Sequence, residues 1–515
     1  MFQNTKLSFF LANFELVFDF STQNQLIAVA FLLITAIANL YAISQNRKLE
    51  SLIGSLYCLS SLVCLFSVDF ISMIISLEFM TIFAYIIVFI GSHSVKHTRQ
   101  YFLTHLFSSG LILIGMSLLI DKTANIAFIP LTTAIYNSEL PAILILAGCL
   151  INASIIFFNG WVVNCYPKAS SSGMIYLISF TTKIALITIF KLFSGLEILK
   201  FCGLAMIIYG LIFALIEKNL RKLICYLTVS QLGFILAAIG INSPRTLYLI
   251  PIFIFMHILY NGVFALYFAI IEDSNDIKNY RDLKTTKYNP ILLIGFVLTI
   301  LIYSSILPIN SSYIKLELAN ALNENYIMIF FKIATCTILF SLVFEGVLAL
   351  LQVSNKEVTS HCERLQGAWQ SHFIILRLLR QSLQFFLAMT PVYLLYLSSC
   401  LITLAICAFY PVQISDVNNN LSIILIAFFL ALLFRSSPRI LTKNINLDLY
   451  RYIQKIIYFC ITKYKEAKSD EIEEDKYFNF KAFWQDTLSK ISAWHNGQTA
   501  IFIVVLMLIS LILVL

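Results

Sequence analysis

The sequence predicts a polytopic all-α membrane protein, a bundle of about fourteen transmembrane helices. Hydrophobic residues fill 59% of its 515 positions and charged residues only 12%, and the mean hydropathy is +0.86. A soluble chain of this length needs far more charge to cover its surface. Apolar runs of roughly 20 residues recur almost from end to end, and they lack the period-2 alternation of a transmembrane barrel.

The individual spans follow from these apolar runs, because a helix in lipid satisfies its backbone groups internally. Their boundaries are set to within about four residues. We place them at 23–45, 51–67, 69–91, 99–120, 138–158, 171–195, 199–217, 221–242, 246–272, 290–320, 323–353, 381–410, 420–435 and 498–515.

Polar stretches divide the chain into parts. These are an N-terminal segment (1–22), a transmembrane core (23–353), a cytoplasmic connection (354–380), peripheral transmembrane helices (381–435), a cytoplasmic or interfacial segment (436–497) and a C-terminal transmembrane anchor (498–515). The two polar segments predict either solvated connections with an interfacial helix or a docking surface for a partner subunit. The N-terminus lacks a basic region leading into a cleavage site, so we expect no cleavable signal peptide.

Basic residues predict the orientation in the membrane. If every span crosses once, one set of alternate connections carries Arg47, Lys48, Lys96, Arg99, Lys168, Lys218, Arg221, Lys222, Lys278, Arg281, Lys284 and Lys287. The opposite set carries only Lys6, Lys122, Lys200 and Arg245. The positive-inside rule places the first set in the cytoplasm and the N-terminus outside. These loops account for the net charge of +8, so we expect no nucleic-acid partner.

Nothing in the sequence indicates a cofactor. The eleven cysteines are scattered, mostly in apolar segments, without a CxxC pair. This pattern favours buried small hydrophobes over disulfides, metal sites or iron–sulfur ligands. The sequence has no phosphate-binding loop, dinucleotide fingerprint, HExxH or nucleophile elbow. We therefore expect no catalytic residue, metal or cofactor in this chain.

Ionisable side chains within the spans are the most informative signal. An ionised group at the bilayer centre costs about 2.5–3.5 kcal/mol on insertion scales, so it usually faces a polar pathway or a partner. Glu78, Lys183 and His257 lie in mid-span, and Lys315 lies in a later span. A carboxylate, an amine and an imidazole can all transfer protons. Each alone could equally form a static interhelical bond, but together they favour an ion path.

Two stretches predict interruptions of regular helix. Pro308 removes a backbone donor within the span 290–320, next to a cluster of Ser and Asn residues that offer other partners. Lys315 follows seven residues later, which fits a discontinuous transport helix. The stretch 159–173, with Pro167 and three serines, is the second candidate. An ordinary loop is the alternative for either stretch.

Motifs from about residue 45 to residue 350 follow one another in a specific order. They are SLEFMTIFAYIIV with Glu78 and Tyr85, RQYFLTHLFSSGLILIG, FNGWVVNCYPKASSSGMIYLISFTTKIAL with Trp161, Tyr166, Pro167 and Lys183, EKNLRKLICYLTVSQLGFILAAIG with Tyr226, Ser230 and Gly233, MHILYNGVFAL with His257, and SILPINSSYIK with Pro308 and Lys315. Together they resemble the antiporter-like proton-channel subunits shared by Mrp-type cation/proton antiporters, membrane-bound hydrogenases and respiratory NADH–quinone oxidoreductase (complex I). The resemblance implies inverted repeats, at least one discontinuous helix, and a proton path through Glu78, Lys183, His257 and Lys315.

Asparagines stand at several positions where the family has charged or titratable residues, and three of them bear on the path. Asn152 stands where the family has the lysine that partners the glutamate represented by Glu78. Asn159 replaces a histidine, and Asn261 replaces a lysine. An asparagine can hold water and hydrogen bonds but cannot carry the charge. We therefore expect a hydrated gap in the path at Asn152, Asn159 and Asn261.

The resemblance implies a proton- or cation-translocating subunit of a multisubunit monovalent cation/proton antiporter, close to its D-type subunit. One alternative is the equivalent proton-channel subunit of complex I, in which case the chain is part of an enzyme without being one by itself. A second alternative is a degenerate structural subunit that does not conduct, which Asn152 and Asn261 support. The expected partners are other membrane subunits of such an assembly and the lipid bilayer. The expected location is the bacterial inner membrane.

Overall fold

The computed structural model describes residues 5–11, 14–92, 95–217 and 219–275, together with 295, 297, 396 and 398–400. The predictions for Lys315, for the spans from 290 onward and for the polar segments 354–380 and 436–497 lie outside these residues.

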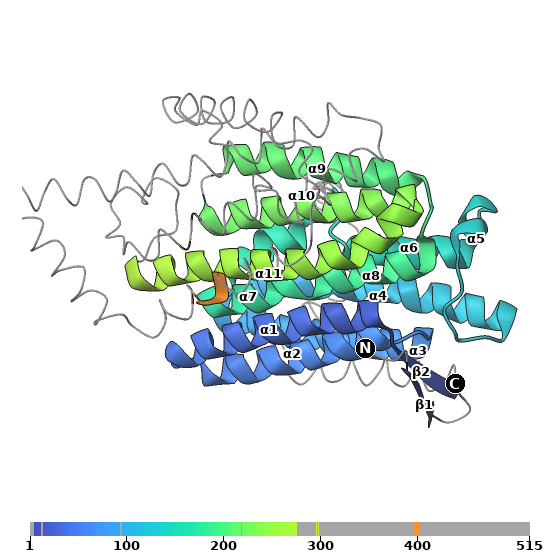
Figure 1. The fold of residues 1–515 in the computed structure, drawn as a ribbon, viewed down its shortest axis with the longest axis horizontal. Coiled ribbons are helices and arrows are strands. Elements are labelled where there is room, and N and C mark those ends of the chain that lie inside the picture. The colour runs from blue at the N-terminus through green and yellow to red at the C-terminus, as the bar shows by residue number, and fades with distance from the viewer. Residues whose placement is uncertain are drawn as a thin grey trace, which may run out of the picture.

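The chain begins with a β-hairpin that the all-α expectation did not include. Strands β1 (Thr5–Leu11) and β2 (Phe14–Phe20) pair antiparallel over their whole lengths. The backbone N–H of Val17 donates to the Asp69 carboxylate at 3.0 Å, which ties the hairpin to the helices. Figure 1 shows the hairpin at one end of the helical bundle.

Helices make up most of the described chain. They are α1 (Thr22–Ser44), α2 (Lys48–Phe66), α3 (Phe70–Ser92), α4 (Val95–Thr123), α5 (Thr132–Tyr136), α6 (Leu140–Asn152), α7 (Ser171–Ser179), α8 (Thr181–Phe193), α9 (Ile198–Ile216), α10 (Leu220–Ile241) and α11 (Pro244–Asn275). Within the described residues, eight segments are long and apolar enough to cross a membrane, α7 and α8 counting as one. They match the expected spans to within a few residues, which confirms a polytopic helical membrane fold.

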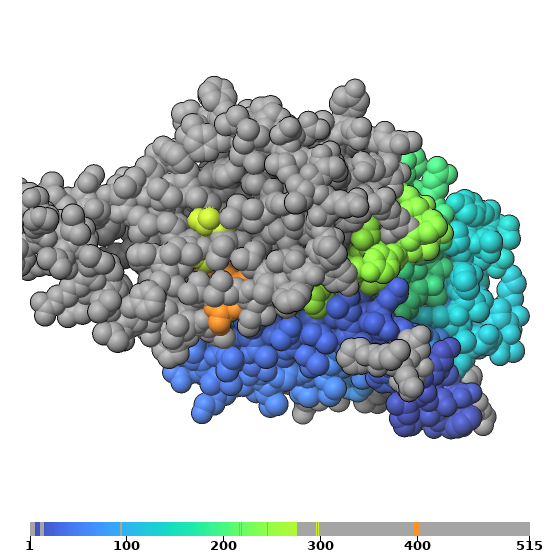
Figure 2. Space-filling model, viewed as in Figure 1, coloured from blue at the N-terminus to red at the C-terminus, as the bar shows by residue number. Residues whose placement is uncertain are grey.

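The helices form an outer group around a buried centre. Helix α1 packs against α2 and α11, α2 against α3, α3 against α4, and α9 against α10. In Figure 1, α1 and α2 lie on one side and α9 and α10 on the other, with α7, α8 and α11 between them. Helices α7, α8, α10 and α11 are buried almost end to end, whereas α1, α2, α3 and α4 bury one face. Figure 2 shows the outer faces of α1 and α2, in blue, at the surface.

Glycines allow α9 and α10 to approach closely. A Cβ built on Gly203 would lie 2.4 Å from the carbonyl oxygen of Gly233, and one on Gly233 would lie 2.6 Å from that of Gly203. Small residues at such contacts are typical of membrane helices, where van der Waals packing drives association.

Two of the expected spans are interrupted. Helix α6 ends at Asn152, inside the expected span 138–158, and the backbone continues through Ser154 and Phe157 with positive φ values of 66° and 72°. A π-helical turn (η1, Trp161–Cys165) and a 3-10 turn (η2, Tyr166–Lys168) follow, within the stretch expected to be irregular. The sequence also predicted a continuous span at 171–195, but Phe180 separates α7 from α8.

Candidate functional site

Lys183 lies in the first turn of α8, directly after the helix break. Its side chain is fully buried, at 0% exposure. The Nζ donates to the carbonyl of Ile178 in the last turn of α7. A helix end leaves carbonyl oxygens without intrahelical partners, so the break supplies an acceptor that a continuous helix would not. Lys183 therefore sits at the centre of the bundle on a discontinuous helix.

Tyrosine hydroxyls gather beside this break. Tyr57 of α2 is hydrogen-bonded to Thr181, two residues before Lys183. The hydroxyls of Tyr101 on α4 and Tyr166 in η2 lie close enough to Tyr57 to interact electrostatically with it. All three tyrosines are buried, at 0% or 1% exposure. A phenol both donates and accepts a hydrogen bond. The hydroxyls of Tyr101 and Tyr166 have no hydrogen-bond partner among the described residues, so this cluster can relay a proton toward Lys183 where water joins its members.

His105 lies one turn beyond Tyr101 on α4, and the two rings are 4.4 Å apart between centroids. Its Nδ1 is 3.0 Å from the side-chain oxygen of Asn152, the last residue of α6. The ring also packs against Trp161, with centroids 4.5 Å apart. The residues considered from sequence did not include His105, although it is an imidazole within a span, as His257 is.

Glu78 on α3 lies beside these residues of α4. It is half-buried, and Ser109 of α4 is its polar neighbour. The Ser109 hydroxyl donates to the carbonyl of His105 at 2.9 Å. Ser109, His105 and Tyr101 therefore follow one another along α4, with Glu78 at one end. This row of polar side chains runs from Glu78 past Asn152 to Tyr57, which is hydrogen-bonded to Thr181 in the turn that carries Lys183.

The other expected residues lie apart from this row. His257 is fully buried on α11, and Asn261 follows it one turn later. The Asn261 amide donates to the hydroxyl of Thr228 on α10 at 3.0 Å. Asn159 precedes η1 and accepts a hydrogen bond of 3.5 Å from the Tyr209 hydroxyl. Asn152 thus borders the first row, Asn159 contacts α9, and Asn261 belongs to the contact between α10 and α11.

Several buried polar atoms in the bundle have no hydrogen-bond partner among the described residues. They include His105 Nε2, Ser154 Oγ, Asn159 Nδ2, Thr182 Oγ1, Ser230 Oγ, Gln231 Nε2 and the hydroxyls of Tyr101 and Tyr166. Leaving such a group unsatisfied costs about 1–3 kcal/mol. Buried water normally satisfies groups of this kind where several of them meet. The interior is therefore chemically suited to hold water beside the titratable side chains.

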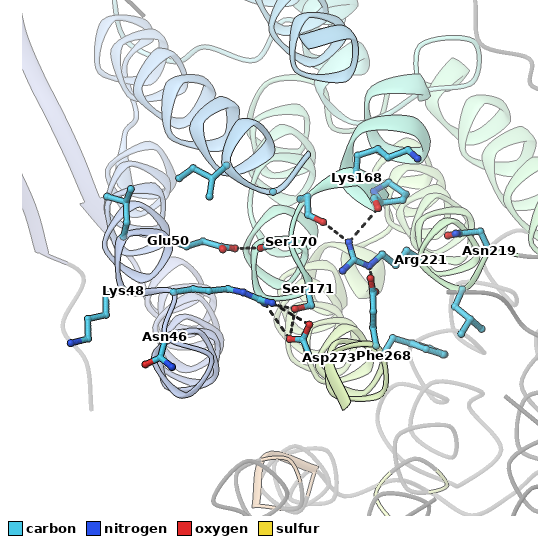
Figure 3. A pocket seen from close by; sticks show the side chains of 18 residues that line it. Asn46, Lys48, Glu50, Lys168, Ser170, Ser171, Asn219, Arg221, Phe268 and Asp273 are labelled. Carbon is cyan, nitrogen blue, oxygen red and sulfur yellow. Dashed lines mark hydrogen bonds and ion pairs between the residues drawn. The ribbon is translucent and has the colours of Figure 1, made fainter. Parts of the chain in front are cut away.

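A second polar region lies at the end of the bundle where the basic connections meet. A cavity of about 600 Å³ opens there between the α1–α2 connection, the start of α7, the start of α10 and the end of α11. Figure 3 shows charged side chains from these elements facing one another across the cavity. The sequence grouped the connections bearing Arg47, Lys168 and Arg221 on one side of the membrane, and the structure brings them to one end.

Two ion pairs cross this cavity. The guanidinium of Arg47 binds both carboxylate oxygens of Asp273, at 3.1 and 3.2 Å. Burial lowers the pKa of Arg47, but the hydrogen bonds and charge of Asp273 outweigh it and raise that pKa above its usual value. Arg221 binds Glu272 at 2.5 Å and donates to the carbonyls of Pro167 and Ala169. These contacts join the α1–α2 connection and α10 to α11, and α10 to the stretch before α7.

Glu50 forms the base of the same region and is only 2% exposed. Its Oε1 accepts hydrogen bonds from Ser170 and Ser172, and Ser170 also caps α7 by accepting from the N–H of Gly173 at 2.8 Å. Sequence reasoning missed Glu50 and Asp273, because a charge at the end of a span is usually interfacial. The sequence pattern that could have identified them is an acidic residue at the end of an apolar run, next to a loop that is otherwise basic.

Comparisons with known proteins agree with this architecture. The family model described as "NADH:quinone oxidoreductase/Mrp antiporter, TM" matches residues 67–341, just over half of the chain. NADH-quinone oxidoreductase subunit N 1 of Thermodesulfovibrio yellowstonii is 25% identical over 269 residues, which cover 48% of this chain and 57% of that protein. NADH-quinone oxidoreductase subunit N of Wolbachia sp. subsp. Brugia malayi is 27% identical over 297 residues, covering 53% and 63%.

This chain therefore matches less than two thirds of the length of either relative. A chain in the Mrp complex from Dietzia sp. DQ12-45-1b has the same fold, with a TM-score of 0.59 at 17% identity, over 84% of this chain and 88% of that one. The protein is thus a multi-pass membrane protein that belongs to the NADH:quinone oxidoreductase/Mrp antiporter transmembrane family.

Proposed function

We propose that this chain is a proton-path membrane subunit of an NADH–quinone oxidoreductase assembly, of the subunit N type, in a bacterial inner membrane. This reverses the order in which the motifs ranked the two assemblies. Both sequence relatives named above are complex I subunits, whereas the likeness to the antiporter complex is one of fold at 17% identity.

One observation carries the proposal: a fully buried lysine on a helix break, with a row of polar groups leading away from it. A charged side chain in the membrane interior costs free energy, so its presence there indicates a functional role. Proton transfer needs groups or waters at hydrogen-bond distance. Hydroxyl, imidazole and amide groups lie between Glu78 and Lys183, and in the proposed path water joins those that do not bond directly. In the proposed path a proton moves from Glu78 to Lys183 and onward to His257 and Lys315, with water at Asn152, Asn159 and Asn261.

The proposed partners are other membrane subunits of the assembly. Large apolar side chains are exposed on the outer faces of α1, α2 and α4, including Leu32, Leu40, Leu52, Leu59 and Phe107. Such faces suit contact with lipid or with the apolar flank of a neighbouring subunit. Affinity purification of the tagged full-length chain would identify the assembly. A hydrophilic NADH-oxidising arm is expected among the co-purifying proteins, and sister antiporter subunits in its place would restore the antiporter assignment.

Proton translocation by the purified assembly in proteoliposomes tests the path. Lys183→Ala is expected to lower the rate roughly 100-fold or more, as when a proton-carrying group is removed. Lys122→Ala is the matched control, because Lys122 is an exposed lysine paired with Glu139 far from this row. If Lys183→Ala translocates protons like the parent, the path proposal fails, and a non-conducting structural subunit takes its place.

A further inference from the structure

We propose that His105 carries the proton between Glu78 and Lys183. It fills the role that a basic side chain at position 152 would otherwise have. The inference rests on the proposed function, since it assigns one more residue to the same path. It explains how a chain with Asn152 could conduct without a lysine at that position.

The hydrogen bond to Asn152 prepares the imidazole for this role. Nδ1 is 3.0 Å from the Asn152 amide oxygen. An amide oxygen only accepts, so Nδ1 carries the hydrogen and Nε2 presents its lone pair. Nε2 is buried and has no hydrogen-bond partner among the described residues. An imidazole in this state can accept a proton at Nε2 and release one from Nδ1, as a relay requires.

The neighbours of His105 lead in both directions along the row. Ser109, one turn later on α4, is next to both His105 and Glu78. Tyr101, one turn earlier, packs against the imidazole and lies beside Tyr57. Tyr57 is in turn hydrogen-bonded to Thr181, in the turn that carries Lys183. His105 is therefore the imidazole between the carboxylate and the amine on this route, with tyrosine hydroxyls on the side of the amine.

A purely structural role explains the site less well. The ring fills space between Tyr101 and Trp161, which a phenylalanine would also do. A phenylalanine would leave the buried Asn152 amide without this hydrogen bond. A side chain that does not titrate could also supply that one hydrogen bond, so the bond alone does not explain an imidazole here. A lysine at 152 would also face this imidazole, and two cations in contact disfavour each other. One basic group at this contact is therefore sufficient, and the chain places it on α4.

The test is proton translocation by the complete assembly in proteoliposomes. His105→Gln is the informative variant, because glutamine can still donate to Asn152 but cannot carry a proton. We expect the rate to fall roughly 10-fold or more, toward the loss seen when an acid–base group is removed. The double variant His105→Gln with Asn152→Lys returns a titratable group to the contact, and we expect it to recover to within about threefold of the parent. His97→Gln, on the same helix but outside the row, is the control and is expected to translocate normally.

The outcomes separate the two proposals. If His105→Gln translocates normally and Lys183→Ala does not, the role of His105 is overturned and the proposed function stands. If both translocate normally, the proposed function fails as well. Should His105→Gln reduce assembly, Asn152→Leu removes the acceptor without altering the ring and is expected to slow translocation roughly tenfold. A parental rate in whichever of these two variants assembles overturns the proposal.

Discussion

Two polar regions of this membrane protein differ in how completely their charges are satisfied. At the end of the bundle that holds the cavity, here called the loop end, Arg47 and Arg221 each bind a carboxylate from α11, and nearby serines and carbonyls add hydrogen bonds to both pairs. In the interior, Lys183 has one carbonyl as its partner among the described residues, and the hydroxyl of Thr182 beside it has none. Charges paired with opposite charges hold neighbouring helices together, whereas groups that lack protein partners are suited to hold water and move protons.

This contrast makes a general point about membrane proteins with several buried charges. A paired charge in a small cavity stabilises a particular packing of helices. An unpaired one in the bundle centre lowers stability, so its presence indicates function. Substitutions in the two regions should therefore affect different properties. Substitutions at the loop end should lower stability, and substitutions in the interior should lower the rate of proton translocation.

The largest effect on stability is expected from Glu272→Ala at the loop end. The side chains of Arg221 and Glu272 are only 11% and 15% exposed, so the change leaves a charged guanidinium without its carboxylate. Breaking a buried pair in this way costs about 3 kcal/mol, at the low end of the usual range because the cavity admits water. The measurement is the thermal midpoint and the yield of the purified assembly.

The control for this prediction removes both charges. Arg221→Met combined with Glu272→Leu is expected to lose clearly less stability than the single variant, because no unpaired charge is left. Translocation per assembled complex should be unchanged in both variants. A large loss of translocation in stable Glu272→Ala complexes would contradict the division between the two regions.

A smaller loss of stability is expected from Arg47→Met. Asp273 would keep hydrogen bonds of 2.6 Å from Ser171 and 2.7 Å from Tyr41, so its carboxylate is not left alone. We expect a cost of about 1–2 kcal/mol, below that for Glu272→Ala. Lys48→Met is the matched control, because Lys48 is exposed and forms no ion pair in the described part of the chain. Equal losses in both variants would show that the pair with Asp273 is not what stabilises this end.

The regular helices could be predicted from sequence because each is a single apolar run between polar residues. Helix α1 at Thr22–Ser44 corresponds to the expected span 23–45 for this reason. The break at Phe180 was missed, since it lies within a longer run that is mostly apolar and neither proline nor glycine marks it. The hairpin was missed although its second strand alternates, with Glu15 and Asp19 between apolar residues. A search for spans alone passes over that period-2 signal.

The candidate site was predictable only in part. Glu78, Lys183 and His257 could be found because charge within a span is costly, whatever the fold. The partners could not, because they depend on tertiary contacts between distant residues. Arg47 and Asp273 are 226 positions apart, and His105 and Asn152 are 47 apart. Each of these residues alone has an ordinary explanation, and only the packing of helices shows which ones meet.

The smallest effect on stability, and the sharpest contrast, is expected from Thr182→Val in the interior. Thr182 is 1% exposed, and its hydroxyl has no hydrogen-bond partner among the described residues. Replacing a buried unpartnered hydroxyl with a methyl group is close to neutral for folding, within about 1 kcal/mol. If the hydroxyl holds water beside Lys183, translocation should nevertheless fall roughly fivefold, the equivalent of one hydrogen bond of about 1 kcal/mol.

Thr188→Val is the matched control on the same helix. Its hydroxyl already donates to the carbonyl of Ile184 at 3.0 Å, so the substitution removes an existing helix contact and not a site for water. We expect a stability change of similar size but an unchanged translocation rate. Rates are measured in proteoliposomes and normalised to assembled complex, with the thermal midpoint recorded for the same samples. Equal slowing by both variants would mean that α8 tolerates no loss of hydroxyls anywhere. In that case the unsatisfied interior would have no special place in the path, and the contrast with the loop end would fail.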